Sequence, residues 1–236
     1  MGETFGYWAG REPDAVAVTE TAGEQRTVTR RELDLQSDYY AALLLDASVR
    51  PDDFVSVRLP STAEFVVACA AAWKVGATVQ SLSHRFSLAE QRAVVELADS
   101  RIVLGATPAE FPGRTTIYAD ADLSGWARGR GHDSTRIRPP SPGRHRRPRA
   151  APAGRRSSWP RPPLTSTPTP VWPRSSRCGP TQLVAGPLYH SAPFTYAMRG
   201  LMTGHALAQM PAFEPAAALG GTRPPPHHLG PCSCPP

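Results

Sequence analysis

The residues with the most recognisable ligand chemistry lie near the end of the chain. Cys232 and Cys234 stand close to His227 and His228, and thiolates with imidazoles are the usual ligands of structural zinc. Pro-rich sequence surrounds all four residues and offers no helix or strand boundary that would fix their geometry. We therefore expect no metal site, and we expect Cys69, which stands in an apolar run, to be a small core residue.

A basic segment in the middle of the chain offers a different chemistry. Residues 136–180 contain twelve Pro and eleven Arg and neither Asp nor Glu. The segment contributes +11 to a total net charge of +6, so the other residues sum to −5. A disordered linker of this composition would bind polyanions by charge alone. Trp159 and Trp172 are too few aromatic residues to stack on bases, so we expect no specific nucleic-acid recognition.

Several function classes are excluded by missing patterns. The sequence contains no GxSxG, GxGxxG or HExxH motif. Its longest apolar run, Phe65 to Trp73, is shorter than the roughly 18 residues that span a bilayer, and the N-terminus lacks the apolar stretch of a signal peptide. Four cysteines are too few for a disulfide framework. We expect a cytoplasmic protein without a membrane span.

The first 105 residues alternate strand and helix signals, which is typical of parallel βαβ units in an α/β fold. The pairs Thr29 with Glu32 and Ser61 with Glu64 have the spacing of capping boxes at helix starts, and Gly76 is a suitable helix stop. We expect helices at 30–47, 65–75 and 87–98, and strands at 15–19, 27–29, 54–59, 78–82 and 101–104.

Short motifs in this region resemble the N-terminal part of the adenylate-forming enzymes, a superfamily of acyl-CoA synthetases, luciferases and peptide-synthetase adenylation domains. They include the following stretches: Pro13-Asp14-Ala15, Thr27-Val28-Thr29, Val49-Arg50-Pro51-Asp52-Asp53, Ala72-Trp73-Lys74-Val75-Gly76-Ala77 and Arg85. The individual motifs carry packing and turn roles rather than catalytic ones. The resemblance implies a partial N-terminal domain of that fold.

A second matching block runs from Thr181 to Leu219. We expect a strand at 182–185, a turn at 187–193, a helix at 194–202 and a strand at 205–210. The block resembles the part of acid–CoA ligases, particularly those of long-chain or bulky acids, that carries a histidine just before a substrate-lining helix. The resemblance implies that His190 binds the substrate near its carboxylate. A turn histidine with purely structural contacts is the alternative.

The gap between the blocks should hold the family's Ser/Thr/Gly-rich phosphate loop, which ends in Lys. The printed residues contain no such loop. A one-base offset, with free choice of third bases, converts Arg147 to Trp159 into Thr-Ser-Gly-Gly-Thr-Gly-Arg-Pro-Pro-Lys-Leu-Val. The same offset converts Gly230 through Pro235 into Ala-Leu-Leu-Val-Pro, which resembles the family's next strand. A frameshift is therefore our leading interpretation, and a genuine Arg/Pro-rich linker is the alternative.

We expect an α/β fold with four parts: an N-terminal α/β part at 1–120, an irregular and disordered Arg/Pro-rich insert at 121–180, a continuation of the domain at 181–219 and an irregular tail at 220–236. The resemblance implies an ATP-dependent, AMP-forming ligase of fatty acid metabolism that transfers a carboxylic acid to CoA with Mg²⁺. A carrier-protein acyl-AMP ligase and a non-enzymatic polyanion-binding protein remain alternatives. The printed chain also ends before the family's adenine-binding motifs, so we expect it to lack ligase activity and to be poorly soluble.

Overall fold

A computed structural model describes residues 3–21, 26–117, 181–210, 213 and 215 of the chain. These residues form two four-stranded sheets and five longer helices, so the expected α/β class is confirmed. The expected disordered insert at 121–180 and tail at 220–236 lie outside the described residues. The elements in chain order are α1 (Glu3–Arg11), β1 (Val16–Glu20), β2 (Thr27–Thr29), α2 (Arg30–Asp46), β3 (Phe54–Val57), α3 (Ala63–Lys74), β4 (Thr78–Ser81), α4 (Leu88–Leu97), β5 (Ile102–Leu104), β6 (Thr115–Ile117), β7 (Thr181–Val184), α5 (Ser191–Met202) and β8 (Ala206–Gln209).

The first sheet, which we call sheet A, combines strands from both ends of the described chain in the order β2-β1-β8-β7. β1 pairs antiparallel with β2 and parallel with β8, and β8 pairs parallel with β7. Val18 lies opposite Leu207 and Glu20 lies opposite Gln209. The hydrogen bonds between β1 and β8 in sheet A therefore join segments that are almost 190 residues apart in sequence.

The second sheet, sheet B, is built from contiguous chain between residues 54 and 117. Its order is β4-β3-β5-β6, and all three pairings are parallel. Ile102 and Leu104 pack into the main core, whereas Val103 points to the opposite face, into a smaller core under α4. This alternation explains why the three residues of β5 are all apolar, since both faces of the strand are buried.

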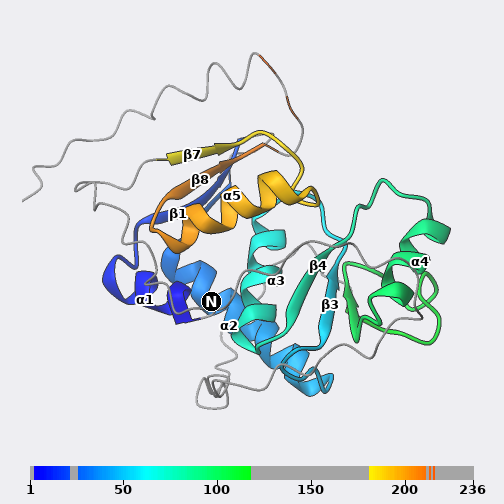
Figure 1. Ribbon diagram of the computed structural model, residues 1–236. Coiled ribbons are helices and arrows are strands. Elements are labelled where there is room, and N and C mark those ends of the chain that lie inside the picture. Colours follow the sequence, from blue (N-terminus) through cyan, green and yellow to red (C-terminus); the bar gives the residue numbers. More distant parts are fainter. Residues whose placement is uncertain (1–2, 22–25, 118–180, 211–212, 214, 216–236) are drawn as a thin grey trace, which may run out of the picture.

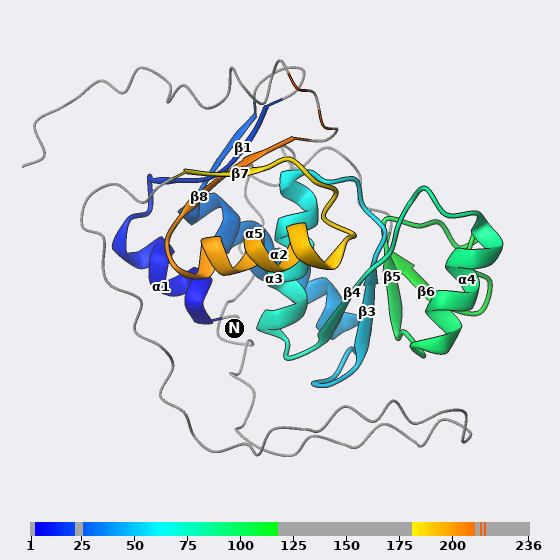
Figure 2. The same ribbon diagram turned by 45° about the horizontal axis from the view of Figure 1, so that its top comes forward.

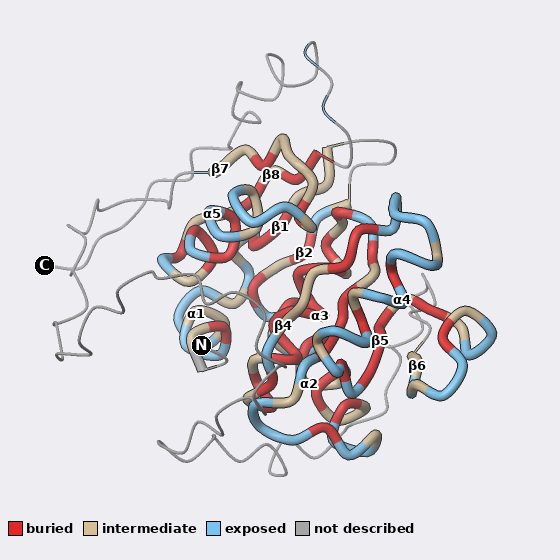
Figure 3. The backbone as a smooth tube through the Cα atoms, turned by 45° about the vertical axis from the view of Figure 1, so that its right-hand side comes forward, coloured by how far each residue is buried: buried red, intermediate tan, exposed pale blue. Residues whose placement is uncertain are grey.

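Helix α3 lies between the two sheets (Figures 1 and 2). It contacts β1 of sheet A as well as β3 and β4 of sheet B. Every residue from Phe65 to Ala72 is buried, in agreement with the apolar character of the helix on all sides. Figure 3 shows this burial in the middle of the molecule, while exposed positions gather on the outer faces of α1, α4 and α5.

A cluster of ion pairs around the buried ammonium of Lys74 joins α3 to α2. The ammonium of Lys74 lies 2.5 Å from Asp34 and 2.6 Å from Asp38, and it donates a further hydrogen bond to the Asp34 carbonyl at 2.8 Å. Burial raises the pKa of Asp38, while its hydrogen bond from Lys74 opposes that change. The cluster satisfies a lysine that is only 8% exposed.

One of the two capping boxes is confirmed. The Thr29 hydroxyl accepts from the Glu32 amide, and the Glu32 carboxylate accepts from the Thr29 amide, so α2 starts as the spacing predicts.

The second capping box is wrong, because other parts of the fold engage both of its residues. The Ser61 hydroxyl accepts from the amide of Leu188, and Glu64 accepts from the Tyr40 hydroxyl. The start of α3 is instead satisfied by Glu20 of β1, whose carboxylate accepts from the Ala63 amide at 2.7 Å. A negative side chain is favourable at this position because helix N-termini carry a partial positive charge.

Two elements were not predicted. α1 contains two glycines, Gly6 and Gly10, and depends on packing of Phe5 and Trp8 against the rest of the fold. β6 has only three residues and is recognisable through its pairing with β5. In the described part of the chain, no helix has the length and apolarity to cross a membrane.

Candidate functional site

The turn between β7 and α5 holds the sequence-predicted site residue, His190. The turn is fixed by two hydrogen bonds with sheet B, one from the loop that follows β3 and one from the last residue of β4. The buried amide of Leu188 donates to Ser61 at 2.8 Å, and the Ser81 hydroxyl donates to the Tyr189 carbonyl at 3.3 Å. Both serines lie at the carboxyl ends of parallel strands, which is where ligands usually bind in open α/β sheets.

Three rings form a row at this position. The His190 ring lies 4.6 Å from the Tyr189 ring in a tilted arrangement, and the Tyr189 ring meets His84 edge-on at 5.8 Å. His84 follows β4 of sheet B, and Tyr189 and His190 follow β7 of sheet A, so the row of rings connects the two sheets. The resulting surface carries two imidazoles and one phenol, which can donate or accept hydrogen bonds.

The surroundings of His84 are electropositive. Partial desolvation, and then the positive charges of Arg85 and Arg58, lower the pKa of His84. Arg58 is held in place by a hydrogen bond to the Gly105 carbonyl at 3.1 Å and an ion pair with Glu110 at 3.0 Å. The lowered pKa favours the neutral form of the His84 imidazole. The nearby guanidinium groups make this surface favourable for anionic ligands.

The shape of the turn depends on Gly186. A Cβ atom at this position would lie 2.6 Å from the ring of Pro193, so a larger residue would push the turn away from α5. The tight turn places His190 at the N-cap position of α5 with extended backbone angles, and its side chain makes no capping hydrogen bond. The imidazole is exposed beside the positive end of a helix, a suitable position for a carboxylate.

Sequence reasoning identified His190 and missed its neighbours Ser61, Ser81, His84 and Tyr189. Ser61 was assigned to a helix cap, Tyr189 lay in the predicted 187–193 turn without an assigned role, and Ser81 and His84 carried no motif. Ser61 and its partner are 127 residues apart in sequence, so local spacing held no signal for this contact.

The described part of the chain contains no candidate metal site. No group of three or more His, Cys, Asp or Glu side chains in residues 3–21, 26–117 and 181–210 could hold an ion. The cysteines and histidines of the tail lie outside the described residues. Cys69 is a free, fully buried thiol in the core, as expected, and its burial raises its pKa well above the ordinary value.

Sequence comparison identifies relatives among adenylate-forming enzymes. The chain is 29% identical over 148 residues to a probable non-canonical nonribosomal peptide synthetase, CymA, of Salinispora arenicola, a match that covers 59% of this chain and 2% of that protein. It is 30% identical over 116 residues to the acetyl-coenzyme A synthetase of Rubrobacter xylanophilus, covering 49% of this chain and 17% of the relative. The chain thus spans a small part of the length of these relatives.

Solved structures share the fold. A fatty acyl CoA synthetase of Mycobacterium tuberculosis superposes with a TM-score of 0.64 at 19% identity, covering 90% of this chain and 45% of the other. The O-succinylbenzoate coenzyme A synthetase of Bacillus subtilis, in complex with AMP, gives a TM-score of 0.62 at 18% identity, covering 92% of this chain and 58% of the other. At these identities the likeness establishes the fold alone. The family model for AMP-binding enzymes matches residues 5–147, more than half of the 236 residues, and the chain therefore belongs to the AMP-binding enzyme family.

Proposed function

We propose that the chain is the N-terminal part of a ligase that activates a carboxylic acid with ATP and transfers it to CoA. A carboxylate oxygen attacks the α-phosphorus of ATP, and pyrophosphate leaves. The CoA sulfur then attacks the acyl carbonyl, its thiol proton is lost to solvent, and AMP leaves with the bonding electron pair. Mg²⁺ would arrive with the nucleotide phosphates and would neutralise their charge.

The observation that carries the proposal is the exposed His190 imidazole at the start of α5, beside Tyr189 and His84. A protonated or neutral imidazole donates a hydrogen bond to a carboxylate, and the helix N-terminus adds a favourable field. His190 is thereby assigned to orient the acid. The His190 ring contacts the Tyr189 ring on one side, but the residue is exposed, so the imidazole is accessible to a ligand.

We also propose that residues 121–180 and 220–236 are read out of frame and that residues 181–219 continue the domain. Shifted reading, with free choice of third bases, permits a Ser/Thr/Gly loop in which small residues let backbone amides surround phosphates. Such a loop would follow β6 and precede β7, so that it lies in the chain between the two sheets. As printed, the chain is expected to lack adenylation activity.

A second candidate function is acyl transfer to a carrier protein instead of CoA. It is favoured by the similarity to a peptide synthetase, whereas the similarity to acetyl-coenzyme A synthetase favours CoA. The two share the adenylation step and differ in the acceptor thiol. Incubation of the adenylate-forming enzyme with CoA or with a phosphopantetheinylated carrier protein separates them by the mass of the product.

The test begins with resequencing of the gene across the codons for Arg136 to Pro180. The product of the resequenced gene is then assayed for pyrophosphate exchange into ATP with a panel of fatty and aromatic acids. We expect a restored phosphate loop and acid-dependent exchange. Confirmation of the printed frame would contradict the frameshift, and a restored loop without exchange for any acid in the panel would contradict the ligase assignment.

His190→Ala should raise the KM for the acid by roughly 10- to 100-fold, because a hydrogen bond to a charged group is worth about 1.5–3 kcal/mol. His205→Ala is the matched control, since His205 lies beyond the other end of α5 and its ring bonds to Thr203 at 2.8 Å. An equal KM in both variants would remove His190 from the acid site.

A further inference from the structure

The described residues fall into two parts of the chain that share an extensive interface. We call residues 3–21 and 26–117 the first segment and residues 181–210 the second segment. β8 of the second segment lies against β1 of the first along a parallel ladder that includes Val18 opposite Leu207 and Glu20 opposite Gln209. Beyond the ladder, Thr21 adds two bonds to the Gln209 carbonyl, from its amide at 2.9 Å and from its hydroxyl at 3.2 Å.

An apolar surface extends this interface from the sheet to α3. Leu188, Ala197 and Leu207 of the second segment are completely buried. Phe194 of α5 meets Phe65 edge-on at 6.2 Å and Trp73 at 6.0 Å, and both of these rings belong to the first segment. The second segment thus covers one side of the central helix layer and places a strand on β1. The second segment is a strand-helix-strand unit, and its β8 extends the β2-β1 pair in the manner of strand addition to a sheet edge.

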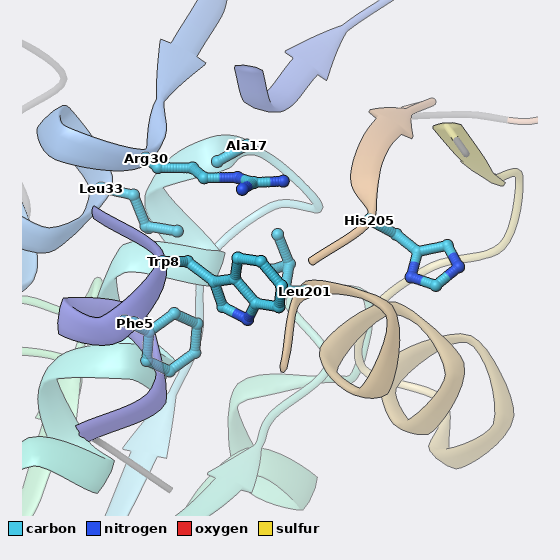
Figure 4. Close-up of a pocket in the computed structure, with 7 residues that line it drawn as sticks. All are labelled: Phe5, Trp8, Ala17, Arg30, Leu33, Leu201 and His205. Atoms are coloured by element: carbon cyan, nitrogen blue, oxygen red, sulfur yellow. The ribbon is translucent and has the colours of Figure 1, made fainter. Parts of the chain in front are cut away.

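Arg30 contacts the second segment at the turn between α5 and β8 (Figure 4). Its guanidinium forms an ion pair with Glu12, donates to the Gly204 carbonyl at 2.6 Å and lies 4.9 Å from the centre of the Trp8 ring. The indole of Trp8 in turn donates to the Met202 carbonyl at 3.0 Å. These bonds use the backbone of the second segment as acceptor, so they recognise the conformation of its turn.

We call the contacts of Arg30 and Trp8 with the second segment the Arg30 seam. The small pocket shown in Figure 4 lies at this seam. Its lining combines Phe5, Trp8 and Arg30 of the first segment with Leu201 and His205 of the second. Because the Arg30 guanidinium already has these partners, we interpret the pocket as an imperfectly filled joint between the segments.

Gly204 makes the seam sensitive to side-chain size. It has a φ of +85°, and a Cβ atom at this position would lie 2.7 Å from the Trp8 ring. Gly113, in the loop before β6, has nearly the same φ of +81°, and a Cβ atom there would meet no neighbouring atom within 4 Å. The two glycines carry the same conformational cost of substitution, but only one of them faces the other segment.

We propose that the second segment is a docked unit, bound to the first segment by this interface and retained without a covalent connection. Its partner is therefore a segment of the same chain, recognised by strand addition to β1, by the apolar face of α3 and by the Arg30 seam. The proposal does not depend on the ligase assignment.

The test uses the 236-residue sequence exactly as printed, expressed from a synthetic gene, with a recognition sequence for a site-specific protease inserted after Ala150 and an affinity tag at the N-terminus. After complete cleavage under native conditions, we expect both fragments to remain together on the affinity resin and on size exclusion. Denaturant should separate them. Native separation of the fragments, without denaturant, would overturn the proposal.

Gly204→Val should weaken retention of the second fragment roughly tenfold or more in a dilution series, because the added side chain overpacks against Trp8. Gly113→Val should leave retention unchanged. Ser61→Ala provides a milder variant, expected to weaken retention about tenfold by leaving the Leu188 amide buried and unpaired. Equal retention in Gly204→Val, Ser61→Ala and Gly113→Val would show that this interface does not hold the segments together.

Discussion

Sheets A and B contain the same number of strands but are assembled in different ways. Sheet B arises from one stretch between residues 54 and 117, and each of its crossovers is short. Sheet A needs β1 and β8 to meet across most of the chain. Local connections make sheet B accessible early in folding, whereas loop-closure entropy opposes sheet A until both segments are present. Sheet A should therefore be the more easily lost of the two.

The largest expected effect comes from the helix layer that both sheets share. Lys74→Met leaves the partly buried carboxylates of Asp34 and Asp38 without their cation and removes three hydrogen bonds of a buried ammonium, and should lower the free energy of unfolding by about 3–5 kcal/mol. Both sheets should lose stability together in chemical denaturation. Arg31→Met is the control, because its ion pair with Asp14 is exposed and should contribute less than about 1 kcal/mol. Equal losses in both variants would contradict a structural role for the buried pair.

Substitutions that create a cavity in each sheet compare the stability of sheet A with that of sheet B. Leu207 of sheet A and Leu104 of sheet B are both completely buried, so each change to alanine should cost about 2–5 kcal/mol. Only Leu207→Ala should also release the second fragment after proteolytic nicking, since Leu104 belongs wholly to the first segment. Release by Leu104→Ala to the same extent would mean that the two sheets are not separable.

Helix caps provide a smaller perturbation on each side. Thr29→Ala removes the cap of α2, next to sheet A, and Ser87→Ala removes the cap of α4, on sheet B. Each should lower the free energy of unfolding by about 1 kcal/mol in thermal or urea denaturation. A loss in Thr29→Ala several times larger than in Ser87→Ala would indicate that Thr29 does more than start its helix.

The smallest effect is electrostatic and confined to the sheet B side. Hydrogen bonds from the Ser87 hydroxyl, and then from its amide, lower the pKa of Glu90. A lowered folded-state pKa stabilises the fold above the unfolded-state pKa of glutamate, and this stabilisation is lost as the pH falls through the folded-state value. Ser87→Ala should move the pKa of Glu90 upward in an NMR titration. An unchanged pKa would show that the capping box does not form in solution.

The individual strands of both sheets were predictable, except β6, because their signals are local, whereas the pairing of β1 with β8 was not. The apolar run of α3 and the stop at Gly76 are such local signals, and these predictions are confirmed with small shifts of the ends. The Ser61 cap was wrong because Leu188, far away in sequence, engages the hydroxyl. α1 was missed since its packing depends on Arg30 and on the backbone of the second segment.

The candidate site shows the same limit. His190 was found through a resemblance to a family, while Ser81 and His84 come next to Tyr189 only in the folded chain. These contacts join the carboxyl end of β4 in sheet B to the turn that follows β7 in sheet A. No periodicity or spacing encodes such contacts, because each depends on how sheet A and sheet B are placed around α3.

The most direct test of the dependence of sheet A on the second segment is hydrogen exchange in the uncleaved Gly204→Val variant, followed at the amides of Val18–Glu20 in β1 and Val55–Val57 in β3. Gly113→Val serves as the reference. We predict that β1 loses protection while β3 keeps it, since disruption of the seam opens sheet A first. Simultaneous and equal loss in both strands, or full protection of β1, would contradict the account.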